Sequence, residues 1–380
     1  MRIALITDGV TPYVLGGIQR HSFNLVRHLA SLGVVIDLYH TDFGSAEGID
    51  KLEGMTPEEK SRITSIAIPW PKRGSVPGHY LRELRAYSKG AYHRFLGRPP
   101  VDFIYVQGLT ASAFTEARVR GQLSVPVGVN LHGLEMFQPA PSWRAIIYNG
   151  LFRHAARRQL RQADYVFSFG GKIRDLVNWE GVPRERVLEI PNAVPRSWVR
   201  EETKRQTNDE CRFVFVGRDE RRKGIEELTS ALATWSHGRS FRFDFVGPIP
   251  VAKQLKRPEV SYHGSITDSV MLQGILDNSD VLVCPSYSEG MPTVILEAMA
   301  RGLAVIATDV GAVRLMVGSD NGILIPHPSV QLIRQAMEQM VGMHAGELAS
   351  LKTSSLRKVQ QFTWDRVAQL TLEQIAARVN

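Results

Sequence analysis

The chain has 380 residues, 43% of them hydrophobic and 22% charged. These proportions are ordinary for a globular protein, and the length suits two domains better than one core. No stretch approaches the roughly 18 consecutive apolar residues of a bilayer-spanning helix, and the apolar start that ends at Asp8 is typical of a first buried strand, not of a signal peptide. Cys211 and Cys284 stand alone, which predicts neither a metal site nor a disulfide framework and favours a cytoplasmic protein.

The formal net charge of +8 is unevenly distributed. Residues 1–195 hold 24 Lys and Arg against 17 Asp and Glu, whereas the remainder holds 22 against 21. The excess lies in segment 70–98, with seven basic residues against Glu83 alone, and in segment 144–161, with five arginines and no acid. This asymmetry and the absence of a recognised nucleic-acid-binding motif argue against a nucleic-acid partner.

Apolar runs alternate with helical patterns along the first half, which predicts βα units around a parallel sheet. The segment from Ile18 to Leu32 carries a helical stripe of apolar residues. The expected strands of this half are 3–6, 34–39, 103–106, 125–130 and 165–169. We therefore expect a first Rossmann-like domain over residues 1–195.

A polar stretch at 200–210 is typical of a linker, and a second cycle of strands follows it. The expected strands are 212–217, 242–247, 260–264, 281–284, 304–307 and 322–325. This second cycle predicts another Rossmann-like domain over residues 196–362, so the fold class is α/β with two comparable units.

The most informative block runs from Pro285 to Gly302 and follows a short buried strand. Pro292 suits the first turn of a helix and Gly302 suits its end. Glu289 then lies on the loop and Glu297 lies inside the helix. Free amides at such a helix start favour an anion, phosphate above all, and the two carboxylates could take the hydroxyls of a sugar and a ribose. The block therefore indicates a nucleotide-sugar site.

The same block resembles the signature of retaining glycosyltransferase family four, whose members have the GT-B fold of two Rossmann-like domains with parallel sheets facing across a cleft. The resemblance implies that Glu289 contacts the transferred sugar and Glu297 the nucleotide ribose. It places Gly290, Met291, Pro292 and Thr293 against the donor. Taken singly, each glutamate has a simpler interpretation: Glu297 could pair with Arg301 four residues on, and Glu289 could be a solvated loop carboxylate.

The pattern Gly-Arg218 followed by Lys223-Gly resembles the family's diphosphate clamp. Cations here would stabilise the charge that grows on a nucleotide diphosphate as the glycosidic bond breaks, which removes the need for a divalent ion. We expect no other cofactor. The alternative is a solvated basic turn, since Arg221 and Arg222 are also present.

Two further features of the first half fit the same site. Gly16 and Gly17 precede a helix and leave amides free for close approach of a ligand; in the family this loop faces the donor. His132 follows a strand at the edge where doubly wound sheets bind ligands, and it resembles the family's histidine near the transferred sugar. A lone Gly-Gly pair is weak evidence, and a lone loop histidine is more often structural.

Three other segments bear on the resemblance. Residues 363–380 resemble the family's last helix, which returns to pack on the first domain. The stretch Gly311-Ala312-Val313 departs from the family's usual Gly-Gly-x-Pro-Glu, and Asn192-Ala193 departs from its usual Asn-Gly. These departures leave open any contact made by the two loops.

The acceptor is expected on the basic first domain. Arg153, Arg157 and Arg161 recur every four residues on one helix face and have apolar neighbours, as does the 70–98 segment. This pattern suits an anionic membrane surface that presents a lipid-linked acceptor, although solvated arginines above a buried apolar face are an equal alternative.

Together these features predict a retaining glycosyltransferase that moves a hexose-type sugar from a UDP- or GDP-sugar to a hydroxyl of a glycan or lipid-linked acceptor, in the synthesis of cell-surface polysaccharide or lipopolysaccharide. The only nearby carboxylate for a double displacement is Glu289, and we favour a binding role for it. The alternatives are a non-hydrolysing nucleotide-sugar epimerase, which shares the fold, and an inactive nucleotide-sugar-binding partner protein.

Overall fold

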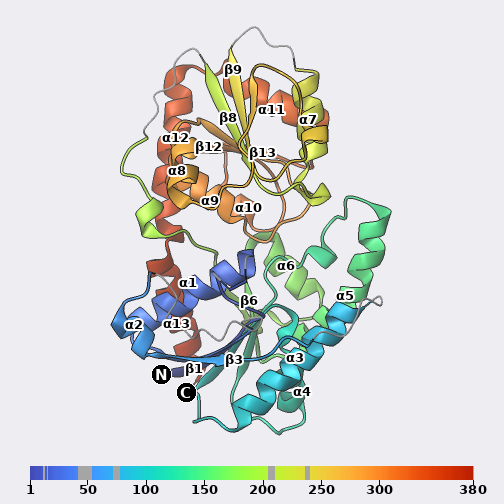
Figure 1. The fold of residues 1–380 in the computed structure, drawn as a ribbon, viewed down its shortest axis with the longest axis vertical. Coiled ribbons are helices and arrows are strands. Elements are labelled where there is room, and N and C mark those ends of the chain that lie inside the picture. The colour runs from blue at the N-terminus through green and yellow to red at the C-terminus, as the bar shows by residue number, and fades with distance from the viewer. Residues whose placement is uncertain are drawn as a thin grey trace. The chain divides into compact units, whose positions relative to one another are not determined.

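A computed structural model describes residues 1–11, 13–14, 16–41, 54–71, 78–203, 210–235 and 240–379. The chain divides into two units (Figure 1). Unit 1 consists of Met1–Phe137, Ile146–Pro191 and Trp364–Asn380, and unit 2 of Gln138–Ala145 and Asn192–Thr363.

Unit 1 is built on a parallel sheet in the order β3-β2-β1-β4-β5-β6-β7. Its strands are β1 Arg2–Ile6, β2 Val35–His40, β3 Ile63–Ala67, β4 Phe103–Gln107, β5 Val127–Asn130, β6 Tyr165–Ser168 and β7 Val187–Glu189. Its helices are α1 Gly17–Ser31, α2 Pro57–Ser61, α3 His79–Leu96, α4 Ser112–Val119, α6 Gly171–Trp179 and α13 Trp364–Ala376, together with most of α5 Trp143–Gln162.

The central strands of unit 1 are buried along their whole length, as expected when helices cover both faces of a parallel sheet. Every residue of β4 and of Ile3–Ile6 in β1 is buried. Helix α1 turns Leu25, Val26 and Leu29 inward, the apolar stripe that its sequence shows. The two strands that the sequence pattern missed are β3, which lies at the sheet edge and carries polar residues, and β7, which has three residues.

Unit 2 repeats this plan with a parallel sheet in the order β10-β9-β8-β11-β12-β13. Its strands are β8 Cys211–Val216, β9 Phe241–Val246, β10 Val260–Tyr262, β11 Val281–Cys284, β12 Ala304–Thr308 and β13 Gly322–Ile325. Helices α8, α9 and α12 lie on one side of this sheet and α7 and α11 on the other (Figure 1). The helices are α7 Ile225–Ala233, α8 Ser269–Asp277, α9 Thr293–Ala300, α10 Val313–Met316, α11 Val330–Gly342 and α12 Ala345–Val359. All six strands expected for this half are present, and the two-domain Rossmann-like fold is confirmed.

Helix α9 has the ends that its sequence predicts, with small shifts. Pro292 is the cap residue just before the helix instead of its first residue. At the other end, Gly302 adopts a left-handed conformation at φ 76°, and its N–H donates to the Met299 carbonyl while Leu303 N–H donates to the Ala298 carbonyl. This is a Schellman ending, which glycine accommodates without a side-chain penalty.

The division into units differs in detail from the boundaries expected from sequence. The second segment of unit 1 ends at Pro191, where we expected the first domain to end at residue 195, and its third segment starts at Trp364, where we expected residue 363. Helix α13 packs on α1 within unit 1. No local pattern predicts Gln138–Ala145, a short segment of unit 2 whose neighbours in the chain on both sides belong to unit 1.

Candidate active site

The strands β8 and β11 are neighbours at the centre of the unit 2 sheet, where the strand order reverses direction. Open α/β sheets bind ligands beyond the carboxyl ends of the strands at such a reversal. The loop after β8 carries Arg218 to Lys223, and the loop after β11 carries Pro285 to Pro292. The topology therefore brings the predicted clamp and the predicted sugar-binding glutamate to one place.

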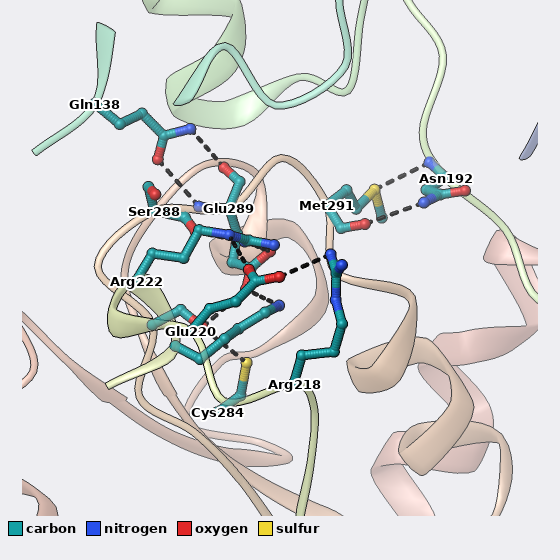
Figure 2. A network of polar contacts seen from close by, with 11 residues as sticks. Gln138, Asn192, Arg218, Glu220, Arg222, Cys284, Ser288, Glu289 and Met291 are labelled. Atoms are coloured by element: carbon teal, nitrogen blue, oxygen red, sulfur yellow. Dashed lines mark hydrogen bonds and ion pairs between the residues drawn. The ribbon is translucent and has the colours of Figure 1, made fainter. Parts of the chain in front are cut away.

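The carboxylate of Glu289 is buried among cationic and polar groups (Figure 2). Its Oε1 accepts hydrogen bonds from Lys223 Nζ at 2.6 Å and Ser286 Oγ at 2.8 Å, and Arg222 Nη1 lies 3.5 Å from Oε2. Burial by itself would raise the pKa of this carboxyl, but the charges of Lys223 and Arg222 outweigh it, so the pKa lies below its ordinary value. Glu289 is thus an ionised, buried acid and not the solvated loop carboxylate of the simpler interpretation.

Lys223 is held in this position by its own backbone. The next residue, Gly224, has φ 70°, and a Cβ there would lie 2.0 Å from the Pro285 carbonyl oxygen. Only glycine allows the start of α7 to approach the β11 loop so closely. Arg218, the other predicted clamp residue, is 72% exposed and pairs with Glu220 Oε1 at 2.8 Å. Lys223 therefore lies at the buried carboxylate, and Arg218 lies nearer solvent.

A second ion-pair cluster joins the same two loops. Arg221 binds Glu227 through two hydrogen bonds of 2.9 and 2.6 Å. Tyr287 Oη donates to Glu227 Oε1 at 2.7 Å, and the Arg221 guanidinium lies 4.8 Å from the Tyr287 ring centroid. Arg221 lies two residues before Lys223, and Tyr287 lies two residues before Glu289. The cluster therefore stabilises both loops that form the site. The alternative of a solvated basic turn does not describe these residues.

Glu297 lies on α9 and is 5% exposed. Arg301, its partner in the simpler interpretation, binds both oxygens of Asp277 at 2.7 Å and the Trp198 carbonyl at 3.0 Å. The guanidinium of Arg301 is therefore committed to α8 and to the chain before β8. Gly290, Met291 and Pro292 are buried and Thr293 is half-buried, which places the amides of the α9 start beside the Glu289 loop.

The two loops that depart from the family pattern both contact this region. Gly311 has φ 54°, and a Cβ there would lie 2.2 Å from the Glu289 carbonyl oxygen and 2.3 Å from that of Gly290. Ala312 N–H donates to the Gly290 carbonyl at 2.8 Å. Asn192 Nδ2 donates to the Met291 carbonyl at 3.1 Å. Both loops therefore shape the backbone between Glu289 and α9.

Residues that the sequence analysis did not single out complete the surroundings of Glu289. Arg222 and Ser286 bind its carboxylate, and Gln138 binds its backbone (Figure 2). Arg222 and Ser286 are each within a predicted motif, so the motif itself could have indicated them. Gln138 is 151 residues away in sequence, and no local pattern points to it.

His132 lies in unit 1, just after β5, in a left-handed conformation at φ 58° that a non-glycine residue seldom adopts. Its N–H is anchored to Asn130 Oδ1 at 2.9 Å, and its Nε2 lies 3.3 Å from Gln107 Oε1, which also accepts from Ser22 Oγ. Burial, with a smaller contribution from neighbouring His21, holds the pKa of His132 well below its ordinary value. The ring is therefore a neutral imidazole whose Nε2 faces an amide oxygen.

Gly16 and Gly17 are exposed at the start of α1 after β1, one residue earlier than the helix start predicted from sequence. Gly16 caps the helix, and no atom lies within 4 Å of the Cβ that Gly17 lacks. Space beside the first amides of α1 is thus available to a ligand.

The predicted membrane-binding arginines have partners inside unit 1. Arg153 Nε donates to the Met136 carbonyl at 2.7 Å, Arg157 is paired with Glu180, and Arg161 Nε donates to the Glu180 carbonyl at 2.9 Å. In the other basic segment, Lys72 and Arg73 lie outside the described residues, and Arg85 and Arg98 pair with Glu116 and Asp37. The solvent-facing side chains of α5 include a group of apolar residues near its start: Trp143, Ile146, Ile147, Tyr148 and Leu151.

Comparison with known proteins fits this geometry. Residues 16–193 match the family described as glycosyl transferase 4-like domain, and residues 210–342 match the family described as glycosyl transferases group 1. The two matches fall on the two Rossmann-like sheets. Each half of the chain therefore resembles a glycosyltransferase family, and the fold is the GT-B fold.

The chain is similar to several known proteins. It is 30% identical over 243 residues to the Bacillus subtilis glycosyltransferase TuaC, named for teichuronic acid biosynthesis, a match that spans 62% of this chain and 60% of that protein. It is 25% identical to D-inositol 3-phosphate glycosyltransferase of Corynebacterium aurimucosum, over 97% of this chain and 94% of the relative. Its fold is similar to that of sucrose-phosphate synthase from Thermosynechococcus elongatus, with a TM-score of 0.79 over 99% of each chain at 21% identity.

Across the described ranges, no group of three or more His, Cys, Asp or Glu side chains could hold a metal ion. Nor does any helix within those ranges have both the length and the apolar character needed to cross a bilayer.

Proposed function

We propose that the protein is a retaining glycosyltransferase that moves a hexose-type sugar from a UDP- or GDP-sugar to a hydroxyl of a glycan or lipid-linked acceptor. The observation that carries the proposal is Glu289: an ionised carboxylate, 6% exposed, that Lys223 and Arg222 hold at the reversal point of the unit 2 sheet. Burial of an ionised acid costs several kcal/mol by itself, and a carboxylate held ionised at a ligand-binding edge of a sheet can accept hydrogen bonds from polar ligand groups.

The donor diphosphate binds to the cationic groups of this site. Lys223, Arg222 and Arg218 supply three positive charges against Glu289 and Glu220, and the first amides of α9 add a partial positive charge. As the bond from the anomeric carbon to phosphate breaks, the leaving diphosphate gains negative charge, and these groups stabilise it more than they stabilise the ground state. We propose on this basis that catalysis needs no divalent ion.

The two carboxylates bind the sugar and the ribose of the donor. Glu289 accepts hydrogen bonds from sugar hydroxyls, and Glu297 accepts from the ribose. We propose that His132, as a neutral imidazole, contacts the transferred sugar, and that the backbone at Gly16 and Gly17 faces the donor. The leaving diphosphate takes the proton of the acceptor hydroxyl on the same face of the sugar, which retains the anomeric configuration without a protein nucleophile.

A donor screen tests the proposal. UDP- and GDP-sugars are added one at a time and the melting temperature is followed, since a ligand at about a hundred times its Kd stabilises the native state by about 2.7 kcal/mol. We expect one nucleotide series to raise it in the wild type and not in Lys223→Ala. If no nucleotide sugar changes the melting temperature of the wild type, the proposal is wrong.

Product analysis separates the enzyme classes. With an accepted donor and a panel of acceptors, NMR of the glycoside should show the anomeric configuration of the donor, with or without EDTA. An isomerised nucleotide sugar formed from the donor alone would indicate an epimerase, and donor binding without turnover would indicate an inactive partner protein.

We propose that the acceptor is met at the inner face of a membrane, during synthesis of cell-surface polysaccharide or lipopolysaccharide. The support comes from the exposed apolar residues of α5, with Ile147 63% and Tyr148 59% exposed on a helix that contains no acid. Arg144 and Arg158 are exposed along the same helix. Binding to anionic vesicles should fall in Ile147→Gln and be retained in Arg157→Gln; no binding to vesicles of either charge would contradict the idea.

A further inference from the structure

The side chain of Gln138 forms a paired hydrogen bond with the peptide backbone of Glu289 (Figure 2). Its Nε2 donates to the Glu289 carbonyl at 2.6 Å, and its Oε1 accepts from the Glu289 N–H at 3.2 Å. Gln138 is 6% exposed. One carboxamide thus binds both polar groups of one residue, as a neighbouring strand would.

The pairing matters because Glu289 lies in a loop, where no helix or sheet provides for its backbone. A buried N–H or C=O without a partner costs about 1–3 kcal/mol. Gln138 supplies partners for both groups, and so holds the two peptide planes that flank the Glu289 Cα. These planes set the direction of the Cα–Cβ bond, from which the side chain reaches Lys223 and Ser286.

The position of Gln138 in the chain gives the pairing a second effect. Residues Gln138–Ala145 belong to unit 2, whereas Phe137 and Ile146 belong to unit 1. Gln138 is the first residue of this short segment, six residues after His132. Its bonds to Glu289 therefore attach the segment to the unit that carries the cationic site.

We propose that Gln138 is a positioning residue of the donor site, which aims the Glu289 carboxylate by holding its peptide and fastens residues 138–145 to unit 2. What Glu289 binds rests on the proposed function; the pairing itself does not. The role needs a side chain that donates and accepts at one end and has this length. Asparagine is one methylene shorter, and a glutamate has both capacities only when it is protonated.

Two substitutions and a control test the role. Gln138→Ala removes both bonds. Gln138→Glu can accept from the Glu289 N–H at neutral pH but cannot donate to the carbonyl, and it can do both once protonated. Gln254→Ala is the control, since Gln254 Nε2 also donates to a backbone carbonyl of unit 2, that of Ile249 at 3.0 Å, in a different loop.

The first readout needs no substrate. Hydrogen exchange is followed by mass spectrometry on the peptide that spans Pro285 to Met291, in the full-length protein. We expect the Glu289 amide to exchange at least about tenfold faster in Gln138→Ala than in the wild type or Gln254→Ala, because its acceptor is gone. Unchanged exchange in Gln138→Ala would overturn the proposal, whatever the protein catalyses.

The second readout is turnover of the UDP- or GDP-sugar identified by the donor screen. We expect Gln138→Ala to lower kcat/KM by about tenfold or more. The activity of Gln138→Glu relative to wild type should rise as the pH falls from about 8 to about 5.5, while that of Gln138→Ala stays constant, because only a protonated glutamate restores both bonds.

The outcomes separate the pairing from the function. Faster exchange combined with wild-type kinetics would overturn the positioning role. A wild type that turns over no nucleotide sugar would overturn the proposed function and leave hydrogen exchange to decide the pairing. If Gln138→Ala does not fold, Gln138→Met takes its place, because it keeps the length of the side chain and removes both bonds: faster exchange of the Glu289 amide than in the wild type supports the proposal, and unchanged exchange overturns it.

Discussion

Lys223 Nζ lies 2.6 Å from Glu289 Oε1, although the two residues follow different strands, β8 and β11. The pair joins the loops that follow these two neighbouring strands, and the Glu289 carboxylate between them is buried. The strength of the pair depends on both partners, because removal of either one leaves the other charge less well compensated; without Lys223, Glu289 would keep Arg222 and Ser286.

The pair can be measured by a double-mutant cycle. Lys223→Met and Glu289→Gln should each lower the free energy of unfolding by about 3 kcal/mol, since each leaves a charge or polar group unpaired. The double variant should lose clearly less than the sum of the two. Equilibrium urea unfolding of the four proteins gives the coupling energy, and additive losses would show that the contact does not couple the residues.

Gly311 should not tolerate a side chain. In Gly311→Ala, the new Cβ would meet the carbonyl oxygens of Glu289 and Gly290 from a backbone at φ 54°. We expect a loss of about 2 kcal/mol or more and a lower affinity for the donor, because the Glu289 loop must move. Gly342→Ala is the control: nothing lies within 4 Å of that position, and the melting temperature should stay the same or rise.

The depressed pKa of His132 makes stability depend on pH in a defined direction. The unfolded chain takes up a proton near pH 6.5 while the folded chain does not, so the free energy of unfolding falls as pH drops below that value. His28, whose pKa burial also lowers, adds to this loss. His132→Gln should show a shallower decrease between about pH 7 and pH 5 in urea titrations. The same change in exposed His93→Gln would contradict the assignment.

Tyr287→Phe tests the ion-pair cluster of Arg221, Glu227 and Tyr287 beside the site. The ring remains for Arg221, but the hydrogen bond from Oη to Glu227 at 2.7 Å is lost. We expect a cost of about 1 kcal/mol and a higher KM for the donor, because Arg222 and Lys223 are adjacent to Arg221. An unchanged KM, with the melting temperature lowered, would limit the cluster to stability.

Much of the fold follows from local patterns. The strands of unit 2 are continuous apolar runs between turns, and α9 is bounded by Pro292 and Gly302, so both could be predicted from sequence. Strand β3 could not, because Ile63–Ala67 carries Thr and Ser at a sheet edge, and its pairing with β2 determines its structure.

The site shows the same division. Glu289, Lys223 and Gly224 lie in motifs that directly follow predicted strands. Because parallel strands end at one edge of the sheet, the sequence predicts that these motifs lie close together. Gln138 comes from a loop that only the folded chain brings to Glu289. The arginines of α5 show the same limit: their four-residue spacing is visible in the sequence, but their contacts with Glu180 and Met136 are not, because these partners lie outside the helix.

Helix α13 has a consequence for synthesis of the protein. Trp364 is 2% exposed, and its ring stacks against His28 of α1. The α13 residues that pack on α1 in unit 1 thus leave the ribosome after most of unit 2, which emerges before them as one stretch. Domains tend to fold as they emerge, so unit 2 can finish while unit 1 still lacks its final helix. A ribosome stalled before Trp364 should therefore carry a protease-resistant unit 2 beside a protease-sensitive unit 1.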